Sequence, residues 1–352
     1  MSMTINPAEA LSSIGAGLAH AWQAFHISSG TVYSVTTLLM ALTISVGFLI
    51  LRRRPGRRRV RIKVLLRALF PGRWLTGPST RTDLIFHIFN MSLFGLLFGW
   101  ALLSIGTVVH GVNAGLESVF GPLQPTSLPK PVAMGIMTLL SFLAYEFGYW
   151  VDHYLKHSIP FLWEFHKVHH AAEVLSPATN ARVHPVDTII FMNILAITMG
   201  ATGGVAYFMF GQKVGQFELL GSNAIICVFM YLLTHLHHTH MWIAFTGWWG
   251  KLIQSPAHHQ IHHSMDPRHF NKNMGGSLAL FDWLFGTLYI PSRRREVTKF
   301  GVEPGDMNPH SVIDSMIAPV RNAARLVLPA NGKAAEPGEA HVMAAGKAVA
   351  GN

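Results

Sequence analysis

Cysteine and charge are both scarce in this chain. Its 352 residues include one cysteine, Cys227, which lies in an apolar run. A single cysteine excludes an intrachain disulfide framework and a multi-thiolate metal site, so any metal must be bound by nitrogen and oxygen ligands. Charged residues make up 12% of the chain and hydrophobic residues 50%, with a mean hydropathy of +0.33. This composition excludes an ordinary soluble domain and predicts an integral membrane protein.

The first thirty residues lack the features of a signal peptide. They do not show the charged start, the short apolar core and the small-residue cleavage site that follow one another in a signal peptide. We therefore expect them to remain as an N-terminal segment of the mature chain. The first apolar span, residues 31–51, carries no charge. It is long enough to cross a hydrocarbon core of about 30 Å.

Acidic residues are missing from the segment that follows this span. Ten basic residues and no acidic one lie between Arg52 and Arg73, whereas the chain before the span has Glu9 and no Lys or Arg. The positive-inside rule therefore predicts that Arg52 onward is cytoplasmic and that the N-terminus is outside. Such a run is typical of a stop-transfer signal that also contacts anionic membrane lipid. We prefer this interpretation to nucleic-acid binding.

Further apolar segments predict an all-α integral membrane helical bundle of about four to five membrane helices. We expect the later helices at Leu84 to about Val109, Val132 to about Leu155, Thr188 to Gly211 and Phe217 to about His235, with an outside loop at Gly111 to Pro131. The His-rich segments then form a cytoplasmic helical cap. The predicted organisation is an N-terminal segment (1–30), the first membrane helix and basic cytoplasmic loop (31–83), the bundle with its catalytic domain (84–291), and a polar, partly disordered tail (292–352).

Histidine is the residue that the chain has in excess. Fifteen of the 21 histidines lie between His153 and His184 or between His235 and His269, less than a fifth of the chain. HxxxH begins at His153, and HxxHH occurs twice, in FLWEFHKVHH at 161–170 and in AHHQIHHS at 257–264. Spacings of three and four residues place side chains on one face of a helix. The histidines with this spacing are His153, His157, His166, His169, His170, His259, His262 and His263.

Two metal ions are the simplest explanation for these histidines. Imidazole is the commonest neutral nitrogen ligand for iron, zinc and copper, and eight such groups exceed what one four- or six-coordinate ion can use. Ionisable groups near a membrane are also costly unless they pair or bind something. The isolated histidines are expected to be surface or packing residues: His20, His26, His87, His110, His310 and His341.

The order and spacing of these motifs resemble those of the fatty acid hydroxylase and sterol desaturase superfamily of integral membrane oxygenases. The flanking words that carry the resemblance are EFGYWVDHYLKH, LWEFHKVHH, NARVHPVD, SPAHHQIHHS and NKNMGGSLALFDWLFGTLY. Together they cover roughly Met134 to Pro291. The chain departs from common members at Glu146, where an aspartate is frequent.

The resemblance implies a non-haem centre of two iron ions that uses dioxygen to hydroxylate or desaturate a lipid chain or sterol. It implies ligand roles for the eight spaced histidines. A further ligand is expected in LLTHLHHTH, which offers His235, His237, His238 and His240. The resemblance favours His238, with His235 one turn earlier as second choice, so the predicted set has nine or ten members.

Neighbouring polar residues are expected to orient the ligating imidazoles through hydrogen bonds, as metal sites generally require. The candidates are Asn180, His184, Asp187 and Asp282, although Asn180 and Asp282 could equally be helix caps. Tryptophans 242, 248, 249 and 283 suit either a rim around the entrance of the substrate site or an aromatic belt at the membrane interface, and we prefer the belt.

No dinucleotide fingerprint, flavin motif, HPGG word of cytochrome b5 or cysteine cluster is present. An oxygenase of this kind therefore needs a separate electron-donor protein, for which the basic segment from Arg52 to Arg73 is a candidate docking surface. Two other classes remain open, a membrane metal transporter and a zinc-dependent lipid hydrolase. A transporter would place its ligands in broken helices at the bilayer midplane, and a hydrolase would need a catalytic carboxylate beside an HExxH-like pair. Hydroxylation and desaturation stay undistinguished.

Overall fold

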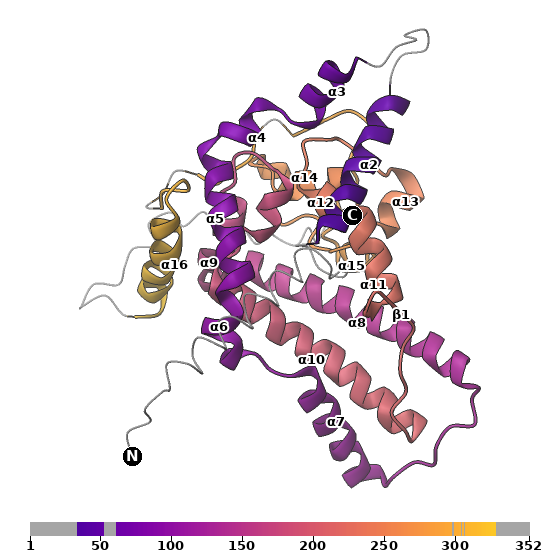
Figure 1. Cartoon of the computed structure of the whole chain (residues 1–352). Helices are drawn as coiled ribbons and strands as arrows, with labels where there is room; N and C mark the ends of the chain where they lie inside the picture. The colour runs from indigo at the N-terminus through magenta and orange to yellow at the C-terminus, as the bar shows by residue number, and fades with distance from the viewer. Residues whose placement is uncertain (1–33, 53–60, 298, 304, 306, 329–352) are drawn as a thin grey trace, which may run out of the picture.

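The computed structural model describes residues 34–52, 61–297, 299–303, 305 and 307–328. Within this part of the chain about two thirds of the residues are helical, and a two-stranded ribbon is the only sheet (Figure 1). Residues 1–33, the basic residues from 53 to 60 and the predicted tail from 329 lie outside the described residues. The prediction of an all-α membrane bundle is confirmed.

Three helical segments are long and apolar enough to cross a membrane: Phe94–Phe120, Lys130–Ser158 and Pro185–Phe210. Two shorter apolar helical segments accompany them, Val35–Leu51 and Ala224–His237. The first segment comprises α6 (Phe94–Phe98), the 3-10 turn η1 (Gly99–Ala101) and α7 (Ile105–Phe120), and the other two long segments are α8 (Lys130–Ser158) and α10 (Pro185–Phe210). The shorter segments are α2 (Val35–Leu51) and the run α11 (Ala224–Phe229), η3 (Met230–Thr234) and α12 (His235–His237).

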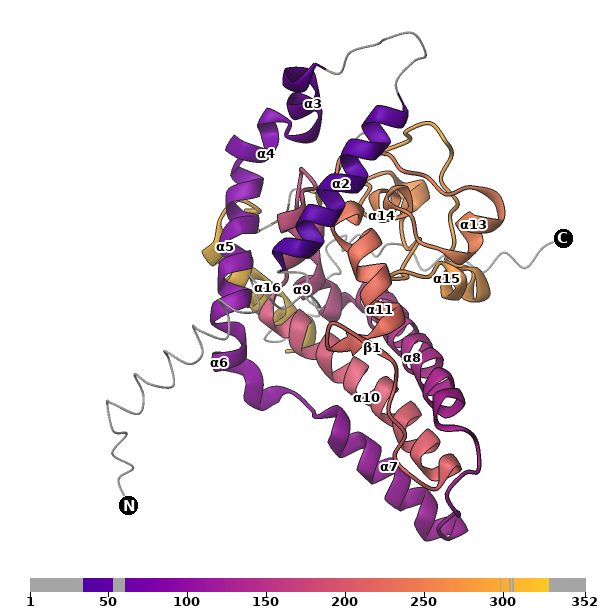
Figure 2. The ribbon, with the colours of Figure 1, turned by 45° about the vertical axis from the view of Figure 1, so that its right-hand side comes forward.

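Small residues let α10 pack closely on α7. A Cβ added to Gly200 would lie 2.5 Å from Val108, and one added to Gly204 would lie 2.6 Å from Val112. Helices in a bilayer associate largely through such close packing, because lipid supplies no hydrophobic driving force between them. Figures 1 and 2 show α7, α8 and α10 side by side, running away from the cap.

The predicted helix from Leu84 to Val109 is wrong. The chain instead forms α5 (Pro78–Ser92), breaks near residue 102, and resumes as α7. The side chain of Asn193 stabilises this break by accepting a hydrogen bond from Leu103 N at 2.7 Å and donating one to Ala101 O at 3.0 Å. Because α7 continues to Phe120, most of the outside loop expected from Gly111 is also helical, and only residues 121–129 connect α7 to α8.

The last apolar helix starts later than Phe217, where the sequence predicted it. Residues Glu218–Leu219 (β1) pair antiparallel with Ser222–Asn223 (β2), and Leu220 and Gly221 between them have positive φ. The side chain of Asn223 then caps the helix by accepting from Ile225 N at 3.0 Å. One turn before its end the helix widens into a π-helical turn, η3, a feature often found at functional sites.

The cap lies at the end of the long helices and contains short helices and loops. Its elements are α9 (Pro160–His170), η2 (Pro177–Ala181), α13 (Gly247–Leu252), α14 (Pro256–His262), η4 (Pro267–His269) and α15 (Leu280–Phe285). Two buried apolar clusters support it, one around Val168 and Phe86, the other around Ile261 and Trp242. The helices α3 (Ile62–Leu69), α4 (Gly72–Thr76) and α5 line its outside (Figure 2).

The segment after Ile290 is less simple than the polar tail that composition predicted. Residues Val312–Val327 form the amphipathic helix α16, whose N-terminus is capped by Ser311. Ala318 of α16 is fully buried in the cluster with Val168 and Phe86, so α16 packs on α9 and α5. On its other face Ile313 and Ile317 are exposed.

Candidate metal centre

Nine of the ten predicted ligands come together as two adjacent groups of buried side chains. Cluster one contains His153 and His157 of α8, His166 and His170 of α9, and His262 of α14. Cluster two contains His169, His238, His259 and His263. Within each cluster the candidate ligand nitrogens all lie within 4.8 Å of one another. The HxxHH motifs therefore act as their spacing predicts, since α9 and α14 each supply both clusters.

The Nε2 atoms of each cluster converge on a small volume. In cluster two, His238 Nε2 lies 3.1 Å from that of His169, 2.9 Å from that of His259 and 3.2 Å from that of His263. In cluster one, His170 Nε2 lies 3.2 Å from that of His157 and 3.0 Å from that of His262. Nitrogens bound to one ion at about 2.1 Å lie about 3 Å apart, so these separations suit a shared cation.

The outer ring nitrogens show that several of these Nε2 atoms are lone-pair donors. Nδ1 of His153 contacts Met274 O at 2.8 Å, and Nδ1 of His262 contacts Lys272 O at 2.9 Å. A carbonyl oxygen only accepts, so each Nδ1 carries the proton and each Nε2 carries a lone pair. Lone pairs facing one another repel unless a cation lies between them. The residues present therefore fit a pair of metal ions.

Burial keeps the clustered imidazoles neutral, which is the form that binds metal. It lowers the pKa of His169 and of His262 to about 3, and it lowers the pKa of His259 and His263 well below the usual range. Neutral imidazole is the ligand form for iron, zinc and copper.

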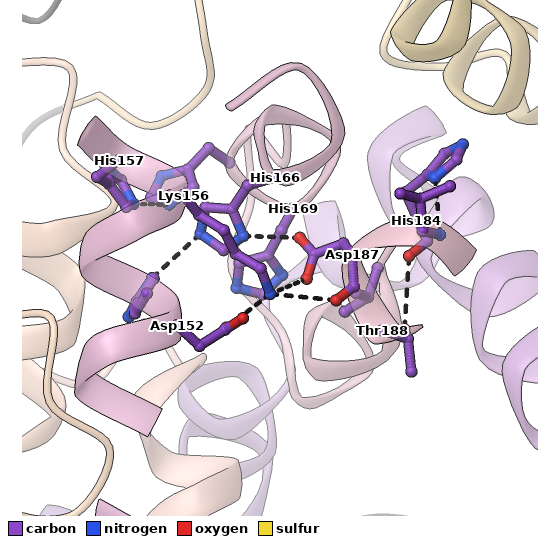
Figure 3. A network of polar contacts seen from close by, with 12 residues as sticks. Asp152, Lys156, His157, His166, His169, His184, Asp187 and Thr188 are labelled. Carbon is purple, nitrogen blue, oxygen red and sulfur yellow. Dashed lines mark hydrogen bonds and ion pairs between the residues drawn. The ribbon is translucent and has the colours of Figure 1, made fainter. Parts of the chain in front are cut away.

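His166 has a carboxylate as its outer partner. Its Nδ1 lies 2.8 Å from Asp187 Oδ2, and Asp187 in turn accepts from Lys156 Nζ at 2.5 Å (Figure 3). Lys156 also contacts Asp152 at 2.6 Å, and all three charged side chains are buried. The predicted orienting role of Asp187 fits this geometry. Asp152 and Lys156 were missed, although their i, i+4 spacing with opposite charges inside an apolar helix was a readable signal.

His235 lies outside both clusters, so the structure does not support it as a tenth ligand. Its Nε2 contacts Thr37 Oγ1 of α2 at 3.0 Å, and its Nδ1 lies 3.4 Å from Asn180 Nδ2. The helix ends at His237, and His238 beyond it has a non-helical backbone (φ −99°, ψ 42°), so the helical spacing that paired it with His235 does not hold. Asn180 thus contacts a histidine that is not in a cluster.

The other two predicted orienting residues act elsewhere. His184 caps α10, because its Nδ1 accepts from Val186 N at 3.1 Å and its Nε2 contacts Met316 O of α16. Asp282 acts indirectly by accepting from Met274 N at 2.8 Å and Gly275 N at 2.8 Å, which fixes the loop whose carbonyl meets His153. Glu146 holds the neighbouring part of that loop by accepting from the backbone of Ser277 and Leu278.

Four more histidines of the second window are not cluster members. His237 contacts Gln254 O at 3.3 Å and stacks on His259, His240 contacts Ala68 O at 2.7 Å, and His258 contacts Gly250 O at 3.0 Å. The ring of His269 packs edge-on against that of Tyr289. Of the predicted interfacial tryptophans, Trp242 is buried and donates to Ser292 O, so its assignment to a belt is wrong. Trp248, Trp249 and Trp283 are exposed.

A cavity of about 370 Å³ opens beside the two clusters. Histidines from both clusters line it, among them His153, His169 and His259. It continues between the membrane helices, where Phe191 and Met192 of α10, Ile226 of α11 and Phe94 of α6 line it. A molecule in this cavity touches the histidines at one part and apolar helix surfaces at another.

The fatty acid hydroxylase family model matches residues 138–287. Ornithine lipid hydroxylase OlsE of Rhizobium tropici is 28% identical over 47% of this chain and 45% of its own length. Alkylglycerol monooxygenase of Homo sapiens is 29% identical over 42% of this chain and 29% of its own length. Cholesterol 25-hydroxylase of Homo sapiens is 25% identical over 48% of this chain and 57% of its own length.

The chain thus spans between 29% and 57% of the length of these curated relatives, and no solved structure matches it. The family match includes all nine clustered histidines, from His153 to His263. The resemblance indicated by the histidine motifs is confirmed, since residues 138–287 of this chain match the fatty acid hydroxylase family.

Proposed function

We propose that the protein is a membrane-bound oxygenase that hydroxylates or desaturates a lipid with dioxygen and externally supplied electrons. The observation that carries this proposal is the pair of nitrogen clusters lining a cavity between apolar membrane helices. Substrate can reach the histidines from the bilayer without crossing water. The names of the similar proteins, lipid and sterol hydroxylases and monooxygenases, support the same class of reaction.

Nine histidines would hold two iron ions, five around one and four around the other. When bound, iron with neutral nitrogen ligands and exchangeable positions supplies the activation of dioxygen for attack on an unactivated carbon. No carboxylate belongs to either cluster among the described residues, so neither cluster contains the catalytic base that a zinc hydrolase would need. His238 is our choice for the ninth ligand.

The chain's own residues orient the ligands and exclude water. Backbone carbonyls of residues 272, 274 and 182 fix three imidazole rings, and Asp187 fixes that of His166. The aromatic rings of Tyr149 and Phe191 pack against each other beside His153 and shield the cavity. Each of these contacts holds a nitrogen or a wall of the cavity in place before substrate arrives.

We further propose that the histidine clusters lie on the cytoplasmic side and receive electrons from a separate protein. The basic helix α3 is next to the cap, since His240 contacts Ala68 O at 2.7 Å. Arg52, at the end of α2, contacts Arg293 O at 3.5 Å. Arg67, Arg295 and Lys299 line one open cleft on this side. Such a surface suits an acidic electron donor, and anionic lipid headgroups near it.

Comparative lipid mass spectrometry tests the proposal. Cells that express the protein should accumulate a lipid heavier by one oxygen atom, or lighter by two hydrogen atoms, in an oxygen-dependent manner. A His169→Ala variant is the inactive comparison, and His110→Ala, an exposed histidine on α7, is the matched control. Identical lipid profiles with and without the wild-type chain, at confirmed expression and iron loading, would refute the proposal.

A further inference from the structure

Four polar side chains that line the cavity have unused hydrogen-bonding capacity. Neither hydroxyl of Tyr145 and Tyr149 has a hydrogen-bond partner among the described residues. Oδ1 of Asp152 and Oδ1 of Asn90 are buried, also without a partner there. Buried polar atoms are nearly always paired in folded proteins, so these two buried oxygens, with two unpaired hydroxyls in the same cavity wall, point to a ligand that pairs with them.

Of the other two charged residues of the wall, Asp187 is already paired with His166, and Lys156 cannot serve this ligand either. Its three N–H groups already contact Asp152 at 2.6 Å, Asp187 Oδ1 at 2.5 Å and Asp187 O at 3.2 Å. The free groups are therefore two acceptor oxygens and two hydroxyls, which can donate or accept. Their best complement is a group that carries hydrogen-bond donors.

These free groups lie beside the histidines. Tyr145 and Tyr149 precede His153 by two turns and one turn of α8, on the same face, and the ring of Tyr149 meets that of His153 edge-on at 5.6 Å. Asp152 is the neighbour of His153 in the chain. An alkyl chain end placed here would leave buried oxygens unpaired, which weakens binding.

Building on the proposed function, we propose that the cavity holds the polar end of a lipid, and not the end of its alkyl chain, beside the histidine clusters. Tyr145, Tyr149 and Asp152 bind a headgroup that carries hydroxyl, amide N–H or ammonium donors. The carbon that is oxidised accordingly lies within a few bonds of that headgroup. The alkyl chain extends along Met192 and Ile226 toward the bilayer.

Phenylalanine substitution isolates the two hydroxyls, because Tyr145→Phe and Tyr149→Phe break no hydrogen bond within the described protein. The matched control is Tyr154→Phe, on the same helix, whose ring stacks on Trp150 outside the cavity. Two probes differ only in donors: an alkylglycerol with a hexadecyl chain, and the same ether with both hydroxyls methylated. Binding of each to the iron-loaded full chain in detergent is measured by titration calorimetry.

We expect the alkylglycerol to bind the wild-type chain about tenfold more tightly than the methylated ether, the size of one good hydrogen bond. Tyr149→Phe should remove most of that difference, and Tyr154→Phe should preserve it. Equal affinities of the two probes for the wild-type chain would overturn the proposal. So would a preference that survives in a Tyr145→Phe, Tyr149→Phe double variant.

Fragmentation mass spectrometry of any oxidised lipid gives a second readout. We expect the new oxygen or double bond within a few bonds of the headgroup, and a position in the middle or at the end of the alkyl chain would overturn the inference. Probe binding needs no turnover. Absence of any oxidised lipid would therefore count against the proposed function alone, while the binding comparison would still decide this inference.

Discussion

At the scale of single residues, the two ring nitrogens of each clustered histidine have different tasks. The inner nitrogen faces the cluster, and the outer one is fixed by a carbonyl in His153, His169 and His262. His166 differs because its outer partner is the carboxylate of Asp187. A carboxylate partner makes the imidazole a stronger electron donor than a carbonyl does.

Removing one ligand from each cluster should abolish the reaction. His262→Ala removes a nitrogen from cluster one and His169→Ala one from cluster two, so we expect both variants to lose oxygen-dependent product formation and to hold at most one iron per chain. Elemental analysis and product assay of the purified chain measure this. His110→Ala should keep both properties, and full iron content in His169→Ala would remove that residue from the ligand set.

The final membrane helix supplies the sharpest comparison between neighbouring histidines. His238→Ala should lose iron and activity because Nε2 of His238 lies within 3.2 Å of three other cluster nitrogens. His235→Ala should keep its iron, since it loses contacts to Thr37 and Asn180 only. His237→Ala should also keep most of its iron and most of its activity. The reverse pattern of iron loss would show that the ligand on this helix is misassigned.

Lys156 has a structural role that a surface lysine does not. Lys156→Met leaves the buried carboxylate of Asp152 without its cation and leaves Asp187 with only the ring of His166 as a side-chain partner, and we expect a loss of about 3–5 kcal/mol in stability together with lower iron content. The control is Lys167→Met, which removes an ion pair with Glu164 near the surface and should cost no more than about 1 kcal/mol. Thermal melting in detergent compares the two. Equal melting temperatures would argue against a buried network.

At the scale of elements, one short helix of the cap supplies histidines to both clusters. Helix α9 has only three turns, yet it supplies His166 and His170 to cluster one and His169 to cluster two. Helix α10 connects the cap to the membrane helices. Asp187 in its first turn contacts the cap, and Gly204 further along packs against α7. The packing of α7 on α10 therefore sets the position of Asp187 indirectly.

A methyl group at the α7–α10 contact should disturb this packing. In Gly204→Ala the new Cβ would lie 2.6 Å from Val112 and 2.8 Å from the carbonyl of Val109, and we expect a cost of about 1–3 kcal/mol. Gly115→Ala on α7, where nothing lies within 4 Å, should be neutral or slightly stabilising. Detergent melting curves test the pair, and a harmless Gly204→Ala would mean that the two helices separate easily.

At the scale of the whole molecule, the two ends of the bundle differ in charge and in chemistry. The basic helix α3 and both histidine clusters lie toward one end, while residues 121–129 and the C-terminal end of α10 lie at the other (Figures 1 and 2). Thr126 N donates to Phe210 O at 2.7 Å, which closes that far end. On the positive-inside rule, we propose that the basic end is the cytoplasmic one.

Cysteine labelling can test this sidedness. On a Cys227→Ala background, we expect Gln124→Cys to react with an impermeant maleimide from outside intact cells and Arg293→Cys to react only after permeabilisation. Both positions are exposed, so neither label needs unfolding. Labelling of Arg293→Cys from outside would show that the proposed topology is inverted, and it would leave the description of the histidine clusters unchanged.

Local spacing predicted the site better than hydropathy predicted the helices. The i, i+3, i+4 patterns at His166 and His259 needed only a regular helix, which both segments form. Hydropathy could not locate the break before α7, because it depends on Asn193 from a distant part of the chain. It also missed the π-helical turn before His235 and the tertiary contacts that bury α16.

The sharing of α9 between the clusters has a consequence for how the proposed two-iron centre would be loaded. Binding of the first ion would fix the rotation of α9, on which His169 and His170 are adjacent. The second ion then meets ligands whose ordering entropy has already been lost, so its apparent affinity rises by linkage. We expect cooperative loading, in which chains with one iron are rare and partial metal depletion yields a mixture of full and empty chains.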